Sequence, residues 1–504
     1  MNTLGPVSPE FDAKQQLARA DWPRFVLVSV VVVLPCFWHR HLEAGDLASH
    51  VYNAWLAHLI QNGQAPGLYI VRQWNNVLFD FTLIGLAKIL GLHVAERIAT
   101  SAAVLIYFWG AFAFVCSITR RTAWNIIPVI AITAYGWTFE EGLMNYYLSI
   151  GLAFIALAIL RSRLGRRKSF VAILAGLIWL ANPLGFIFLV SAAAYIFLAE
   201  SLTARKQGLL FAASALLIVA AHFYIVASLP QNISPGSRYG IIWKVEPGVL
   251  FDGHDQLWLY APKYLLLAYL LECFIWGSTL IDVDARKRIP RFWRTYLLPA
   301  QLYGLVLVAA TLLPTDIRLP QYAAPLEFLT ERLTSVSAIL ACCLLATAKP
   351  RKWHFAASAM IAALFFVLLY KDTATIGRME DQVESIVRTL PPGQRVVANI
   401  NWPGPGSRVE RQHIVDRACI GWCFSYGNYE PSTGQFRIRA EPGDPFVVAD
   451  PESVGAAAAG TYVVQKSDLP LHEIYFCDPG VTKLCIYELA SGDTTGAVLT
   501  QRPQ

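Results

Sequence analysis

Residues 41–63 (HLEAGDLASHVYNAWLAHLIQNG) hold the acidic and imidazole side chains with which this chain could do chemistry. Glu43, Asp46 and His50 fall in a short stretch directly after the first apolar segment. A carboxylate there could act as a general base, which takes the proton of a hydroxyl group as that group attacks a substrate. His50 follows Asp46 by about one helical turn and could orient it or take the proton itself. Asp46 also stands where a helix N-cap would, so capping is its alternative role.

The residues after Asp46 predict an amphipathic helix. Apolar side chains recur at roughly helical spacing, namely Leu47, Val51, Trp55, Leu56, Leu59 and Ile60. We expect such a helix to lie flat on a membrane surface with its apolar face toward the lipid. Asp46 would then stand at the boundary between water and lipid.

The composition predicts a polytopic membrane protein with an additional domain. Of the 504 residues, 55% are apolar and 15% are charged, whereas soluble domains carry about 25% charged residues. The net charge is +6, but the basic residues fall in loops between apolar segments. We therefore interpret them as topology signals and not as a nucleic-acid surface. The polar segment 1–23 lacks the basic start and the cleavage site of a signal peptide, so the first apolar segment is expected to stay as an anchor.

The apolar segments give the expected topology. About eleven transmembrane helices are expected, near residues 24–38, 95–118, 123–138, 142–160, 169–182, 184–200, 208–228, 262–281, 296–313, 335–348 and 354–370. Residues 76–92 are interrupted by Asp80 and Lys88, and we interpret them as a surface or re-entrant helix. With that segment outside, every loop rich in Lys and Arg falls on the side of the N-terminus. The N-terminus is then cytoplasmic and the C-terminus lies outside.

The outer loops differ in length and charge. The first, residues 39–94, is long, and a later loop carries Glu140 and Glu141. Basic residues of the outer loops and the boundaries of the spans are Arg72, Arg238, Lys263, Arg318 and Arg332. His254 with Asp252 and Asp255 could ligate a metal, although a solvated loop is the favoured interpretation. Charged side chains from several loops could thus converge over Asp46.

The composition changes after residue 371. A polar amphipathic helix is followed by expected strands in residues 391–401, 460–470 and 482–492, bounded by Gly, Pro and Asp. The expected division is a cytoplasmic segment (1–23), a transmembrane domain (24–371) and an extracytoplasmic α/β domain (372–504).

Four cysteines lie in the C-terminal part. The local pairings Cys419–Cys423 and Cys477–Cys485 are favoured, because four cysteines in an exported domain suggest two disulfides. The alternative is a zinc site of four thiolates, whose usual spacings are tighter. The aromatic stretch 417–431 (RACIGWCFSYGNYEP) could stack on sugar rings or form a core beside a disulfide.

A long first outer loop with an acid on its helix, an acidic loop two spans later, many spans and an exported C-terminal domain together resemble the glycosyltransferase-C superfamily. The resemblance implies an integral-membrane enzyme that uses polyprenyl-phosphate-linked sugars as donors. The family's acids in the first outer loop correspond to Asp46 and Glu43, and its second acidic position corresponds to Glu140 or Glu141. Adjacent paired acids are absent, so dependence on a divalent metal such as Mg²⁺ or Mn²⁺ is left open.

The chemistry implied is an inverting attack of an acceptor hydroxyl on the sugar C1. Asp46 would be the base, with His50 as orienter or alternate base, and a cation would stabilise the leaving phosphate. The phosphate-binding candidates are, in order, Arg332, Lys263, Arg318, Arg238 and Arg72. The expected partners are the lipid-linked donor, membrane lipid and an acceptor glycan, lipid or protein, and no nucleic acid. The expected location is the cytoplasmic membrane of the cell envelope, with the C-terminal domain periplasmic or extracellular.

The alternative function is non-catalytic, either transport of a lipid-linked saccharide or a structural role in a membrane complex. A transporter would carry charges near the middle of its spans. The expected spans are almost free of charges, and Glu272 is the clearest exception. This distribution favours chemistry at the outer face.

Overall fold

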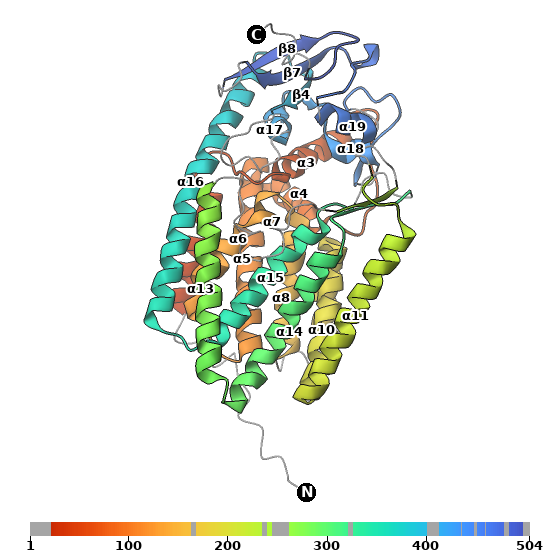
Figure 1. Cartoon of the computed structure of the whole chain (residues 1–504). Helices are drawn as coiled ribbons and strands as arrows, with labels where there is room; N and C mark the ends of the chain where they lie inside the picture. Colours follow the sequence, from red (N-terminus) through yellow and green to blue (C-terminus); the bar gives the residue numbers. More distant parts are fainter. Residues whose placement is uncertain are drawn as a thin grey trace.

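The protein is an elongated bundle of helices with a small β-sheet at one end (Figure 1). This computed structural model describes residues 22–162, 168–233, 239–243, 262–320, 326–400, 413–434, 436–447, 451–458, 460–477 and 483–496. Helices make up 68% of the structure. The expectation of a helical membrane protein is thereby confirmed.

Within the described ranges, seven helices are long and apolar enough to cross a membrane. They are α5 (Leu92–Thr119), α10 (Pro183–Ser201), α11 (Ala204–Ser228), α13 (Pro262–Arg286), α14 (Pro290–Leu312), α15 (Leu329–Thr347) and α16 (Lys352–Val387). Shorter apolar helices are α2 (Trp22–Val33), α8 (Met144–Leu160) and α9 (Lys168–Ala181).

One expected span is not a continuous helix. Residues 123–138 instead form η2 (Trp124–Ile126), α6 (Ile127–Ala134) and, after a break, the first residues of α7 (Trp137–Glu140). Eight residues of α-helix extend over about 12 Å, far less than the membrane thickness of about 30 Å. The break falls at Gly136, whose backbone is extended. The apolar composition was a correct signal of burial, but the segment is broken into short helices and is not one continuous helix.

Helices α5 and α8 lie at the centre of the bundle. Two glycines let the two helices approach each other closely. A Cβ at Gly110 would lie 2.4 Å from the carbonyl oxygen of Gly151, and a Cβ at Gly151 would lie 2.7 Å from the Cα of Tyr107. Small residues at such crossings allow backbone contact between apolar helices. The rings of Tyr107 and Tyr147 stack beside this contact, with centroids 4.5 Å apart.

Helix α3 (Leu47–Gln61) lies between the bundle and the C-terminal region (Figure 1). Leu47 and Val51 belong to the core of the bundle. Tyr52 and Leu56 pack in a second core with residues of the C-terminal region. Protein therefore covers both sides of the helix, and the prediction of a helix lying on lipid was wrong. The C-terminal residues that cover one side of the helix lie more than 300 positions away in the sequence. The expected second helix of this loop is present as α4 (Leu78–Leu90), packed on α5.

The C-terminal region contains a four-stranded sheet in the order β5-β4-β7-β8. Its strands are β4 (Arg395–Asn399), β5 (Phe424–Ser425), β7 (Leu471–Phe476) and β8 (Leu484–Leu489). Strand β4 is parallel to β5 and β7, and β8 is antiparallel to β7. The strands expected within 391–401 and 482–492 are confirmed.

The strand expected within 460–470 is wrong. That segment contains the short turn η6 (Lys466–Asp468), and the strand begins afterwards at Leu471. The Asp468 carboxylate accepts the backbone N–H of Gln465 at 2.7 Å. Such local side-chain bonds compete with the hydrogen-bond ladder of a sheet.

A short antiparallel seam joins the first outer loop to the C-terminal region. Strand β1 (Leu68–Ile70) pairs with β6 (Ile438–Ala440) through three residue pairs. A second seam joins β2 (Gly240–Ile242) to β3 (Asp316–Arg318). The first seam brings the segment around residue 430 beside the loop that carries Asp46.

Both predicted disulfides are confirmed. Cys419 and Cys423 are joined with an S–S distance of 1.95 Å, and Cys477 and Cys485 with one of 2.01 Å. The first bridge closes the turn after α17 (Ile414–Cys419). Closed loops restrict the unfolded chain and so stabilise the folded one.

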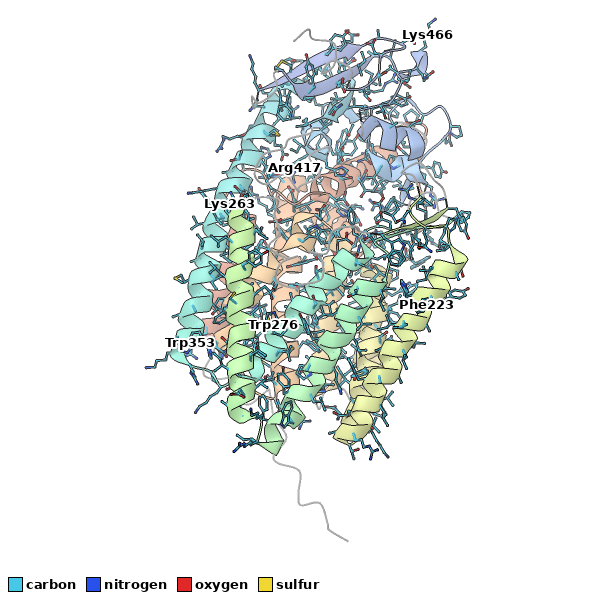
Figure 2. The ribbon with its side chains drawn as sticks, in the orientation of Figure 1. Phe223, Lys263, Trp276, Trp353, Arg417 and Lys466 are labelled. Atoms are coloured by element: carbon cyan, nitrogen blue, oxygen red, sulfur yellow. A yellow bond between two sulfur atoms is a disulfide. The ribbon has the colours of Figure 1, made fainter. Side chains whose placement is uncertain are left out.

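A buried guanidinium fixes α17 to the bundle (Figure 2). Arg417 donates from Nη1 to both carboxylate oxygens of Glu380 on α16, at 2.9 and 2.7 Å. Its Nη2 donates to Glu96 on α5 at 2.7 Å and to the carbonyl oxygen of Leu42 at 2.8 Å. Glu43 and His41 complete this group of five ionisable side chains, which we call the Arg417 cluster. Through it, one side chain ties the C-terminal region to two helices and to the loop before Asp46.

Replacing Arg417 by Gln should strongly destabilise the protein, because the variant removes the guanidinium that pairs with the buried Glu96 and leaves Glu380 with His41 alone. Breaking a buried ion pair from one side costs about 3–5 kcal/mol. The measurement is the thermal unfolding midpoint in detergent. The control is Arg378→Gln, which changes an exposed arginine near Glu380 on the same helix. Equal midpoints for the two variants would contradict the role assigned to Arg417.

Candidate active site

Two glycines place Asp46 at the start of α3. Gly45 and Gly142 both have positive φ values, and the turns that contain them lie against each other. A Cβ at Gly142 would lie 2.4 Å from the backbone nitrogen of Asp46. That nitrogen donates its hydrogen to the carbonyl oxygen of Glu141 at 3.1 Å. The loop with the second pair of predicted acids thus supports Asp46 through backbone contacts.

The Asp46 carboxylate does not cap its helix. It makes no side-chain hydrogen bond to the first turn of α3. Instead, the hydroxyl of Tyr429, the first residue of α18 (Tyr429–Thr433), donates to the carboxylate, with both oxygens at 2.8 Å. Burial and the Asp46 charge raise the pKa of Tyr429 well above its usual value, so the phenol keeps its proton. The carboxylate is therefore held by the C-terminal region and not used for capping.

Two histidines face this carboxylate from opposite parts of the chain. The Nε2 atom of His50 lies 3.5 Å from one oxygen, and the Nε2 atom of His413 lies 3.8 Å from the other. The Nδ1 atom of His50 is 2.8 Å from Asp80, and that of His413 is 2.9 Å from Asp416. The five side chains alternate between carboxylate and imidazole, and we call them the acid–imidazole chain.

The charges in the acid–imidazole chain follow from its geometry. A carboxylate only accepts hydrogen bonds, so each Nδ1 carries a hydrogen toward Asp80 or Asp416. The Nε2 atom of each imidazole faces the Asp46 carboxylate, and this contact is favourable only if Nε2 also carries a hydrogen. Burial alone would lower the pKa of His50, but the charges of Asp80 and Asp46 raise it to about 9. His50 is therefore a cation at neutral pH, and its charge keeps the neighbouring carboxylates ionised.

The outer carboxylates are themselves fixed by hydrogen bonds. Asn145 donates to Asp80 at 2.8 Å. Asp416 accepts from the amide of Asn428 at 3.1 Å and from the hydroxyl of Ser425. Such support holds each imidazole in one orientation.

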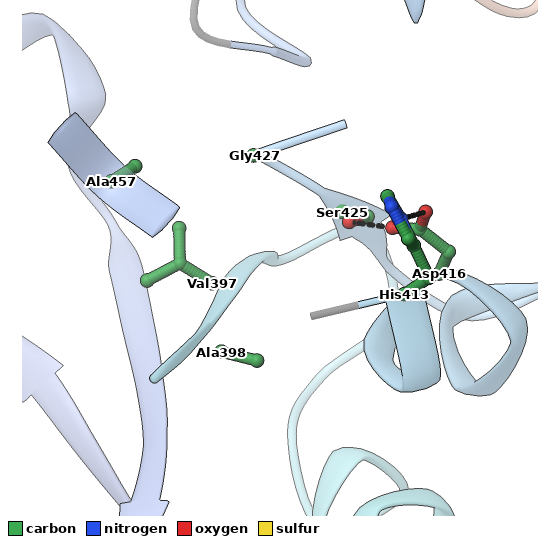
Figure 3. A pocket seen from close by; sticks show the side chains of 7 residues that line it. All are labelled: Val397, Ala398, His413, Asp416, Ser425, Gly427 and Ala457. Atoms are coloured by element: carbon green, nitrogen blue, oxygen red, sulfur yellow. Dashed lines mark hydrogen bonds and ion pairs between the residues drawn. The ribbon is translucent and has the colours of Figure 1, made fainter. Parts of the chain in front are cut away.

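A small pocket opens beside His413 (Figure 3). His413, Asp416 and Ser425 form one wall, and small apolar side chains form the other. The remaining lining residues are Val397, Ala398, Gly427 and Ala457. The pocket therefore borders the two members of the acid–imidazole chain that come from the C-terminal region, His413 and Asp416.

The structure separates the predicted acids by role. Asp46 and His50 lie together as expected. Glu43 instead lies in the Arg417 cluster, where burial and Glu380 raise its pKa well above the usual value. Because a raised pKa disfavours the ionised carboxylate, this position favours Asp46 over Glu43 as a base. Glu140 is buried and Glu141 half-buried in the turn behind Asp46.

The predicted phosphate-binding residues are also separated. Arg332 lies in the first turn of α15 (Leu329–Thr347) with its guanidinium over the ring of Tyr146, 5.4 Å from the centroid, and within electrostatic range of Asp46. Lys263 is paired with Asp372 at 2.6 Å. The other candidates are an exposed Arg72 and a half-buried Arg318 in β3, while Arg238 lies outside the described residues. The loop with His254, Asp252 and Asp255 is also outside them.

Four members of the site were not predicted as functional residues: Asp80, His413, Asp416 and Tyr429. Asp80 gave a signal, because it is an acid in an otherwise apolar stretch. Tyr429 lies in the aromatic stretch 417–431, whose rings could stack on a sugar. Nothing in the local sequence connects His413 with Asp46, because the contact joins residues far apart in the chain.

The donor atoms around Asp46 test whether Mg²⁺ or Mn²⁺ would fit. These cations prefer several carboxylate, carbonyl or water oxygens. In the described part of the chain, the groups facing Asp46 include a phenol and two imidazoles, and Asp80 and Asp416 are engaged by those imidazoles. This set does not fit a magnesium-type site, and no step below depends on a metal.

A second group of ligand-type atoms lies at an exposed edge. His41, Asp381 and Glu384 have spacing suited to a metal ion. Arg40 donates to Asp381 at 2.9 Å and to Glu384 at 2.8 Å. Because a guanidinium already neutralises both carboxylates, this group is not part of the candidate site.

The chain matches no family model, no curated protein and no solved structure. A functional proposal therefore depends on the geometry of the acid–imidazole chain and on its place at the end of the bundle.

Replacing Gly142 by Ala should displace Asp46, because the new Cβ would collide with its backbone. The matched control is Gly63→Ala. Gly63 has φ +70° and Gly142 has φ +72°, but a Cβ at Gly63 meets nothing within 4 Å. The left-handed backbone should lower the stability of both variants by about 1–2 kcal/mol, and only Gly142→Ala adds a steric clash. The thermal unfolding midpoint should fall further for Gly142→Ala, and equal losses would contradict the close contact.

The stability contributed by His50 should depend on pH. Its folded pKa of about 9 lies above the unfolded value of about 6.5. The contribution, on the order of 3 kcal/mol, is thus fully present below pH 6.5 and is lost as pH rises through 9. The measurement is the difference in unfolding midpoint between the native protein and His50→Gln. A difference that stays constant or widens from pH 6 to pH 9.5 would exclude the charged imidazole.

Proposed function

We propose that this protein is a membrane glycosyltransferase that moves a sugar from a polyprenyl-phosphate-linked donor to an acceptor. The acceptor hydroxyl would attack the sugar C1 with inversion, and the lipid phosphate would leave. Asp46 would take the hydroxyl proton. The observation that carries this proposal is the Asp46 carboxylate, held by Tyr429 and flanked by two histidines instead of capping its helix.

The charges around Asp46 support a role as general base. A base must be ionised before the reaction, and the cationic His50 favours the ionised carboxylate. The same charge argues against His50 as the base, because a protonated imidazole has no free electron pair. His50 is thus better suited to orient Asp46. A positioned base of this kind contributes about 100- to 10,000-fold to the rate.

The position of the site supports chemistry at a membrane surface. The acid–imidazole chain lies where the helical bundle meets the C-terminal region, and Arg332 enters the bundle nearby. A guanidinium at that depth could stabilise the charge that develops on a lipid phosphate. We infer about eleven spans in the intact topology, with a cytoplasmic N-terminus.

The two disulfides support an exported C-terminal domain, since disulfides persist in oxidising compartments. The proposed active site is then on the outer face of the cytoplasmic membrane. Its acceptor would be a glycan, lipid or protein in that compartment. The competing proposal is a transporter or structural subunit, for which Asp46 would have no role in turnover.

The test follows the release of free polyprenyl phosphate by mass spectrometry, with purified protein and a panel of polyprenyl-phosphate sugars. Asp46→Asn should lower kcat by at least about 100-fold while the protein remains folded. Tyr429→Phe should lower kcat less, because it removes one hydrogen bond and leaves the carboxylate in place. Asp381→Asn, at an exposed acid in the same outer region, should retain native activity.

Turnover that survives Asp46→Asn would exclude Asp46 as the base. Absence of turnover with every donor, together with co-purifying partner chains, would favour the non-catalytic function.

A further inference from the structure

An arginine beside the acid–imidazole chain is buried with two of its three side-chain nitrogens unpartnered. Arg437 directly precedes β6, and 6% of its surface is exposed. Its Nε and Nη2 atoms are both buried and have no hydrogen-bond partner among the described residues. Burying a charged donor without a partner is costly, so this arrangement requires an explanation.

The surroundings of Arg437 place it next to the proposed active site. Its carbonyl oxygen accepts the N–H of Val71 at 2.8 Å, which extends the β1–β6 seam. Its charge acts on two carboxylates, Glu430 and Asp80. Glu430 directly follows Tyr429, and Asp80 holds His50. Arg437 therefore belongs to the same buried group of charges as Asp46.

The two unpartnered nitrogens are chemically a pair. Nε and Nη2 share one edge of the planar guanidinium, and their N–H groups point in parallel. This edge matches the two oxygens of a carboxylate or phosphate and binds them through two parallel hydrogen bonds. Glu430 and Asp80 lie within electrostatic range, yet neither accepts a hydrogen bond from this edge.

The carboxylate of Glu430 is engaged elsewhere, because it accepts the backbone N–H of Ile438 at 3.2 Å. Burial raises the pKa of Glu430 to about 7, although the charge of Arg437 opposes that rise. Asp80 is engaged by His50 and Asn145. The neighbouring acids therefore accept hydrogen bonds from other donors and not from the Nε–Nη2 edge of Arg437.

We propose that the Nε–Nη2 edge of Arg437 binds an oxyanion of the substrate. The group is either the phosphate of the lipid-linked donor or the carboxylate of an acidic sugar, which offer the same pair of oxygens. This inference rests on the proposed function, but it concerns binding and not the proton transfer by Asp46. The edge is enclosed in this structure, so binding involves a local rearrangement beside β6, which pairs with β1 through three residue pairs.

The test measures binding to the full-length protein in detergent by native mass spectrometry, with undecaprenyl phosphate and glucuronic acid as separate probes. The variants are Arg437→Gln, which removes charge and edge, and Arg437→Lys, which keeps the charge and removes the edge. The control is Arg439→Gln, since Arg439 is half-buried on the same strand. All variants are first compared with the native protein for their unfolding midpoint.

Both Arg437 variants should weaken binding of one probe by about 10-fold or more, the value expected for a charge-assisted pair of hydrogen bonds. Arg439→Gln should leave that binding unchanged. Weakened undecaprenyl phosphate binding would identify the donor phosphate as the ligand, and weakened glucuronic acid binding would identify an acidic sugar.

Two results would overturn the proposal. One is native affinity for both probes in Arg437→Gln. The other is full recovery in Arg437→Lys, which would show that only the charge of Arg437 matters to its neighbours. Failure of the proposed function would look different, because Asp46→Asn would then keep turnover whatever the binding at Arg437.

Discussion

The buried guanidinium of Arg417 determines how the C-terminal region meets the helical bundle. Removing this charge from water is expensive, and the cost is offset only if several acceptors surround it. Glu96, Glu380 and the carbonyl of Leu42 supply those acceptors from three separate segments. A pair of this kind adds little net stability, but it strongly disfavours other arrangements of the same segments. We therefore interpret the Arg417 cluster as the feature that selects one arrangement of these segments over the others.

The position of the candidate site follows from that constraint. Asp416 directly precedes Arg417, and His413 lies one turn earlier, so fixing Arg417 also fixes the imidazole that faces Asp46. The Cys419–Cys423 disulfide restricts the turn that follows. On the other side, the contact of Gly142 with the backbone of Asp46 fixes the carboxylate. Both halves of the acid–imidazole chain are therefore held by rigid parts of the fold, as pre-organised chemistry requires.

Local interactions were the part of this structure that the sequence could predict. Asp46 and His50 are one helical turn apart, and the cysteine pairs are separated by 4 and 8 positions. Apolar composition located the helices, but it could not show that α3 is covered by protein or that the backbone breaks at Gly136. Tyr429 and His413 meet Asp46 across more than 360 positions, and only the folded chain brings them together. The strand expected within 460–470 did not form, because the Asp468 side chain accepts the backbone N–H of Gln465 in place of a neighbouring strand.

The most direct test of the account is a structure of the Asp46→Asn variant with a polyprenyl-phosphate sugar bound, determined by cryo-electron microscopy in lipid nanodiscs. The substitution should block turnover and so retain the donor. We predict that the sugar lies between α3 and α18, with its C1 atom close to position 46 and the lipid chain along the bundle. A donor bound near the middle of the membrane, or away from position 46, would contradict it and favour transport.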